Sequence, residues 1–115
     1  MPELADVRIE VVGESTVIRI KGEVDLSNAW TVARAMREAI TNQAHTVVVD
    51  LTEVNFLDSA GIRVLFDLSR GLAEHDQQLI VVLPVGATSR RALEVSAFAT
   101  AARVVETLDD ALGSS

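Results

Sequence analysis

The sequence contains no cysteine, which excludes disulfide bonds and thiolate chemistry and fits a reducing compartment. Long apolar runs are absent too, and none approaches the roughly 20 residues that a membrane-spanning helix requires. Residues Met1–Leu4 show neither the basic nor the apolar segment of a signal peptide. Together these absences predict a soluble cytoplasmic domain that does not insert directly into a membrane.

Basic residues are scarce relative to acidic ones. The chain has 10 Lys and Arg against 17 Asp and Glu, with a net charge of −7 and a pI of about 4.7. Such a surface repels a phosphate backbone, so we expect no nucleic-acid partner. It would accept a basic protein surface more readily.

The length of 115 residues suits one domain, residues 1–115, with an ordered core of about 5–112. Hydrophobic residues make up 49% of the chain, which is typical of a globular protein. No repeat, low-complexity segment or linker divides it.

The most informative stretch begins with Val47–Leu51, which apart from Asp50 is an apolar run rich in β-branched residues and is typical of a strand buried on both faces of a parallel sheet. The stretch ends at Asp58-Ser59, where a helical pattern begins. Open α/β sheets place their sites at the carboxyl ends of such strands. Ser59, at or beside the N-cap of the following helix, is therefore the main candidate site residue.

The elements before this strand form a hairpin and a helix. The alternation in Val7–Val11 and Val17–Ile20, broken by Gly13–Ser15, predicts a β-hairpin. Residues Gly22–Asn28 are predicted to cross into a helix capped by Ser27 or Asn28. Its apolar stripe consists of Ala29, Ala33, Met36 and Ile40, and we expect Trp30 to lie in the core.

The elements after this strand complete a small α/β domain. The pattern predicts a helix over about Ala60–Glu74, a buried strand over Leu79–Leu83, a short helix capped by Thr88 or Ser89, a brief strand at Val104-Val105, and a last helix opened by Thr107–Asp110. We therefore expect a mixed sheet, made of the opening hairpin plus parallel strands, with about four helices packed on it.

Enzyme signatures are missing. The sequence has no phosphate-binding glycine loop, and Leu57 stands where a nucleophile elbow places glycine. His45 is expected near the opposite end of the central strand, and His75 about 20 Å from Ser59 along the helix. Two isolated histidines without cysteine suggest no metal site. We therefore predict no enzymatic activity and no cofactor, and a hydrolase using Ser59 is the least favoured alternative.

Three segments resemble the STAS domain, in particular the stand-alone anti-sigma factor antagonists of bacteria. They are the loop Gly22–Asp25, the strand residues Val49–Leu51, and the strand-to-helix segment Leu57–Ile62. Arg91–Phe98 is also similar to the short third helix of that family. The resemblance covers nearly the whole chain, with the family's element order.

The resemblance implies a phosphorylation switch. In the family, the anti-sigma factor is a serine kinase that phosphorylates the serine corresponding to Ser59; Asp58 matches the preceding aspartate, and Asp25 the acidic residue of the neighbouring loop. The unphosphorylated antagonist binds the anti-sigma factor and releases the sigma factor. Phosphorylation breaks that complex and a phosphatase restores it. The expected partner-binding residues are Asp25, Ser27, Asn28, Asp58, Ala60, Gly61 and Arg63.

Two positions depart from the family pattern. Ala60 stands where the family often has a second hydroxyl, and Ala97 where it usually has glycine. Taken alone, Ser59 also fits an N-cap that contributes ~1 kcal/mol to stability. An alternative function is a STAS adaptor subunit of a stress-signalling scaffold or of a transporter, with no phosphorylation.

Overall fold

A five-stranded mixed sheet organises the computed structural model, which describes residues 5–87 and 102–113. The strand order is β1-β2-β3-β4-β5. Strands β1 and β2 are antiparallel and form the predicted opening hairpin, and the other neighbours are parallel, as expected for a mixed sheet. The strands are β1 Ala5–Val12, β2 Ser15–Val24, β3 Thr46–Leu57, β4 Gln78–Val82 and β5 Arg103–Val105.

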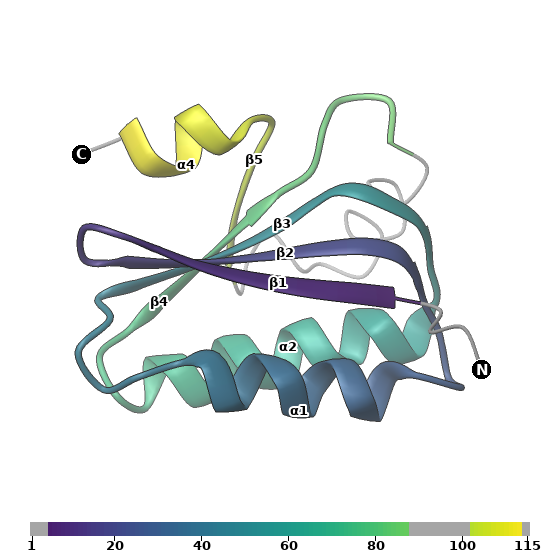
Figure 1. The fold of residues 1–115 in the computed structure, drawn as a ribbon, viewed down its shortest axis with the longest axis horizontal. Coiled ribbons are helices and arrows are strands. Elements are labelled where there is room, and N and C mark those ends of the chain that lie inside the picture. Colours follow the sequence, from purple (N-terminus) through teal and green to yellow (C-terminus); the bar gives the residue numbers. More distant parts are fainter. Residues whose placement is uncertain (1–4, 88–101, 114–115) are drawn as a thin grey trace.

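Helices cover both faces of the sheet. Helices α1 (Ala29–Ala39) and α2 (Ser59–Ala73) lie side by side on one face, and the short α4 (Leu108–Gly113) lies on the other (Figure 1). The described residues therefore contain three helices rather than the expected four or so. The helix predicted after Thr88 or Ser89, which includes Arg91–Phe98 and Ala97, lies outside the described residues.

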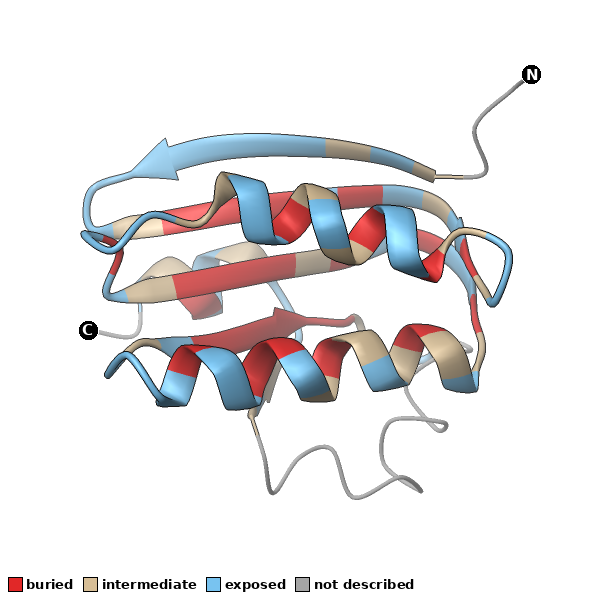
Figure 2. Ribbon diagram, turned by 90° about the horizontal axis from the view of Figure 1, so that it is seen from below, coloured by how far each residue is buried: buried red, intermediate tan, exposed pale blue. Residues whose placement is uncertain are grey.

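Strand β3 lies at the centre of the sheet, and its first part is buried on both faces, as its composition predicted. Val47 and Val49 belong to the core cluster beneath α1 and α2, whereas Val48 belongs to a second cluster beneath α4. All three have zero exposure. Figure 2 shows this burial along the central strands and the exposure of β1 at the edge.

The inward face of α1 differs from the predicted stripe. Ala29, Val32 and Met36 are buried, whereas Ala33 is only partly buried and Trp30 is 68% exposed. Because successive helical residues are about 100° apart, a helix that turns Ala29 inward turns Trp30 away from the core. The expectation of a core tryptophan was wrong.

Strand β2 extends through Val24, so Gly22 and Glu23 belong to the strand and not to the crossing segment predicted from sequence. Its pairing with β3 shifts register between Gly22 and Glu23. Gly22 has a φ of 112°, a conformation that favours glycine. The irregularity brings the end of β2 beside the end of β3, where the candidate site lies.

No helix within residues 5–87 or 102–113 is long and apolar enough to cross a membrane.

Candidate functional site

Asp58 begins α2 as its N-cap. Its Oδ1 atom accepts hydrogen bonds from the backbone N–H groups of Ala60 (2.9 Å) and Gly61 (3.1 Å), two of the donors that a helix start leaves without partners. The sequence placed Ser59 at or beside the N-cap, and the structure assigns the cap to Asp58.

Because Asp58 caps α2, Ser59 has no capping role; it is the first residue of the helix. It is exposed, and its hydroxyl makes no hydrogen bond to any described residue. The hydroxyl lies where the positive end of the helix dipole favours negative charge. The site therefore presents an accessible nucleophilic oxygen that contributes nothing to the cap.

The loop between β2 and α1 is ordered by its own polar side chains. Asp25 Oδ1 accepts hydrogen bonds from the backbone N–H (2.9 Å) and hydroxyl of Ser27. Asn28 Oδ1 accepts from the Asp25 N–H (2.9 Å), and Asn28 Nδ2 donates to the Glu23 carbonyl (2.7 Å). Asn28 is the N-cap of α1 by position, but its side chain makes no capping bond. These contacts hold the loop in one shape before any partner binds.

Two hydrogen bonds join this loop and the end of β2 to the start of α2. Asp58 Oδ2 accepts a hydrogen bond from the Leu26 N–H (3.1 Å), and the Asp58 N–H donates to the Val24 carbonyl (3.2 Å). The two segments that the sequence singled out are therefore adjacent, although 32 residues separate Leu26 from Asp58.

Gly61 faces the interior of the domain. It is buried, and a Cβ atom there would overlap Leu57 Cδ1 and come within 3.2 Å of the Val24 carbonyl oxygen. The missing side chain thus allows α2 to approach β2 and β3 closely. Gly61 is one of the expected partner-binding residues, and the structure gives it a packing role inside the domain.

Exposed apolar side chains lie in and beside the loop, and the sequence analysis did not identify Leu26 and Phe56 among them. Leu26 is 83% exposed and Trp30 68%, and Phe56, two residues before Asp58, is 48% exposed. The Arg34 guanidinium lies over the Trp30 ring, 5.8 Å from the ring centroid. An apolar residue inside a polar loop was the available signal, since Leu26 stands between Asp25 and Ser27.

Arg63 lies one helical turn after Ser59. It is exposed, and its Nε atom is 3.7 Å from a carboxylate oxygen of Asp67, which also pairs with Arg70 at 3.1 Å. This charged face of α2 is exposed to solvent, where such ion pairs contribute little to stability.

The histidines lie away from Ser59. His45 precedes β3, whose full length separates it from α2, and His75 follows the far end of α2. Within the described part of the chain, no three His, Cys, Asp or Glu side chains are grouped as metal ligands.

A mixed sheet of this order with helices on both faces is the fold of STAS domains. The STAS domain family model matches residues 6–111, and the chain belongs to this family.

Several proteins similar to this chain are named as anti-sigma factor antagonists. The chain is 30% identical over 96 residues to the anti-sigma-F factor antagonist RsfB of Mycobacterium tuberculosis, covering 84% of this chain and 77% of RsfB. An anti-sigma factor antagonist from Mycobacterium paratuberculosis has a similar structure (TM-score 0.86, 26% identity, 96% and 92% of the two chains). The phosphorylated form of Bacillus SpoIIAA shares the fold (TM-score 0.70, 23% identity, 95% and 98%).

Proposed function

We propose that the chain is an anti-sigma factor antagonist that binds an anti-sigma factor serine kinase and is switched off by phosphorylation of Ser59. The observation that carries the proposal is that the Ser59 hydroxyl is exposed and takes no part in the cap of α2, because Asp58 is the N-cap. The antagonist relatives and the phosphorylated form of a structural relative support it.

The position suits a modification that changes binding and leaves the fold intact. A phosphate adds about −1.5 to −2 charge at pH 7. At the first turn of α2 the helix dipole and free N–H groups favour that charge, so the domain stays folded. At a docked surface beside Asp25 and Asp58, the same charge adds repulsion and a desolvation cost.

The proposed docking surface consists of the loop with Leu26, the first turn of α1 with Trp30, and the start of α2. Leu26 and Trp30 offer apolar area in the centre, and Asp25 and Asp58 offer negative charge. A partner that complements this surface has an apolar pocket with basic residues around it. In this proposal a separate phosphatase removes the phosphate, and the chain itself catalyses no reaction.

Incubation with the anti-sigma factor kinase and ATP, followed by mass spectrometry, tests the proposal. We expect one phosphate on Ser59 and none on Ser27, the other exposed serine of the surface. We expect Ser59→Asp to weaken the complex by at least about tenfold and Ser59→Ala to keep it, since a buried unpaired charge costs several kcal/mol. Ser15→Ala, at the start of β2 and so at the opposite end of the sheet, is the matched control.

A different result would favour the adaptor function. If the kinase leaves Ser59 unmodified while the Leu26 and Trp30 surface still binds a partner, the chain acts as a STAS adaptor without phosphorylation. Hydrolytic turnover that disappears in Ser59→Ala would contradict both functions.

A further inference from the structure

The outer edge of β1 is open. Strand β1 pairs with β2 alone, and no other described strand pairs with its second edge. Backbone groups of a strand point alternately to its two sides, so half of those in β1 face this edge. Of the seven large hydrophobic residues that are exposed among the described residues, three lie on β1: Ile9, Val11 and Val12. An open edge with apolar side chains is a template for another strand.

The two faces of β1 differ in character. Val7 and Ile9 stand opposite Ile20 and Ile18 of β2, on the face that packs against α1. Asp6, Arg8 and Glu10 point to the other face.

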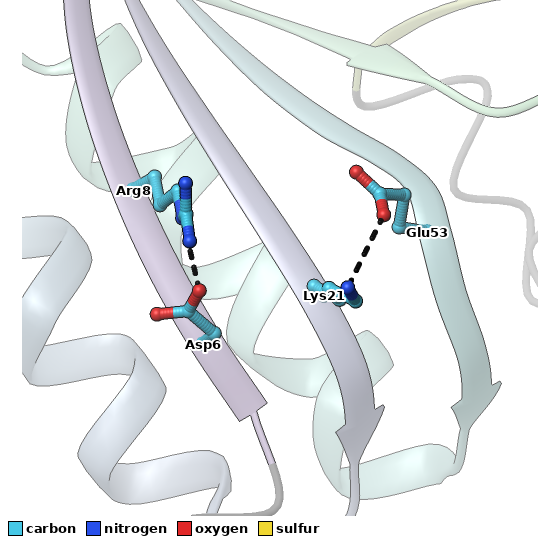
Figure 3. Close-up of polar contacts among 4 residues, drawn as sticks. All are labelled: Asp6, Arg8, Lys21 and Glu53. Carbon is cyan, nitrogen blue, oxygen red and sulfur yellow. Dashed lines mark hydrogen bonds and ion pairs between the residues drawn. The ribbon is translucent and has the colours of Figure 1, made fainter.

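That other face is charged. Arg8 contacts Asp6 at 3.0 Å, and Lys21 contacts Glu53 at 3.9 Å (Figure 3). Glu10 lies 3.7 Å from Arg19, the residue directly opposite Arg8. Any strand that adds to the edge must therefore match an apolar row on one face and a charged row on the other.

We propose that two copies of this chain form a dimer by antiparallel pairing of their β1 strands around a two-fold axis at Ile9. In this register Ile9 faces Ile9 of the second copy, and Val7 faces Val11. Arg8 faces Glu10, and the symmetry repeats that pair. The apolar row thus meets an apolar row, and each charged residue at the centre meets its opposite charge.

Other registers match less well. Side chains alternate between the faces, so the register slides only in steps of two residues. If the two-fold axis moves to Arg8, Arg8 faces Arg8 and Asp6 faces Glu10. If it moves to Glu10, Glu10 faces Glu10. If the axis moves to Val7, Asp6 faces Arg8, but Val11 lies outside the paired segment. Charges usually protect an edge strand, but here their order is self-complementary.

The dimer should be weak. Pairing from Asp6 to Val12 spans roughly 20 Å at about 3.4 Å per residue. One strand pair buries less than the roughly 1,200 Å² of a standard complex, so we expect dissociation in the micromolar range or above. Strand β2 lies between β1 and β3, so the proposed interface is two strands away from β3, which Ser59 follows.

Two charge variants and their mixture test this register by analytical ultracentrifugation from micromolar to millimolar concentration. Arg8→Glu and Glu10→Arg each set like charges opposite each other twice, so each variant alone should weaken dimerisation at least about fivefold. In an equimolar mixture each substituted side chain faces its opposite charge on the other variant, so association should return. Ser59→Asp is the control and should leave association unchanged.

Three results would overturn the proposal. One is a chain that stays monomeric over the whole concentration range; the edge of β1 would then be a site for a strand of a different protein. Another is association that neither variant weakens, and the third is a mixture that stays dissociated. Thermal unfolding of each variant checks that these exposed substitutions leave the fold intact. Hydrogen exchange supplies a second readout, because dimer formation should protect amides of β1 and not those of α2.

Discussion

The carboxylate of Asp58 accepts a hydrogen bond from the backbone N–H of Leu26, with 3.1 Å between Oδ2 and N. The other oxygen of the same carboxylate caps α2. One side chain therefore holds the start of a helix and the loop before another helix in a fixed relationship. Because Ser59 and Leu26 lie on either side of this link, the two segments form one surface, which is the proposed docking surface.

We predict that Asp58→Ala destabilises the domain by about 1–3 kcal/mol, since it removes the cap of α2 and leaves the Leu26 N–H without its acceptor. Ser59→Ala should change the free energy of unfolding by no more than about 0.5 kcal/mol. Urea denaturation of both variants measures the difference, with Asp58→Asn as a cap-retaining control. A larger cost for Ser59→Ala than for Asp58→Ala would return the capping role to the serine.

The two glycines of α2 offer a matched pair. Gly61→Ala should cost about 1–3 kcal/mol because its methyl group overlaps Leu57, whereas Gly71 has open space around its Cβ position. Gly71→Ala should therefore stabilise the chain by about 0.5–1 kcal/mol through the better helix propensity of alanine. Thermal or urea unfolding measures both effects. Equal effects of the two substitutions would mean that α2 lies farther from Val24 than the structure has it.

Trp30 should report on partner binding. It is the only tryptophan and is 68% exposed, so acrylamide should quench its fluorescence efficiently in the free chain and less in the complex. Trp30→Ala should leave stability within about 0.5 kcal/mol and weaken the complex by at least about 2 kcal/mol, as central aromatic residues of interfaces do. Arg37→Ala, at an exposed position farther along α1, is the control. Quenching that the partner leaves unchanged would place the interface elsewhere.

Phosphorylation itself should stabilise the free domain slightly. A phosphate on Ser59 lies at the start of α2 and one turn before Arg63, whose pairing with Asp67 is long at 3.7 Å. We expect a gain of about 0.3–1 kcal/mol at low salt, which decreases in Arg63→Gln and at high salt. Urea denaturation of the phosphorylated and unphosphorylated chains measures it, with Arg70→Gln as control. A phosphorylated domain that is less stable than the unmodified one would contradict this assignment of the site.

Much of the fold follows from local pattern. The β-branched run Val47–Leu51, the alternation around Gly13 and the helical periodicity after Ser59 each report a neighbourhood of a few residues, and all three predictions were confirmed. The helix count differed, because the described residues contain three helices and the remaining prediction falls outside them.

The sequence by itself determined the elements and placed Ser59 between a buried strand and a helix, because periodicity and capping preferences act over a few neighbouring residues. Only the tertiary structure decided that a carboxylate oxygen of Asp58 caps α2, that position 61 has no room for a side chain, and that Trp30 faces solvent. Each of these depends on contacts or on the direction of a helix face toward the sheet. The bond from Asp58 to Leu26 spans 32 residues, a distance that no local pattern encodes.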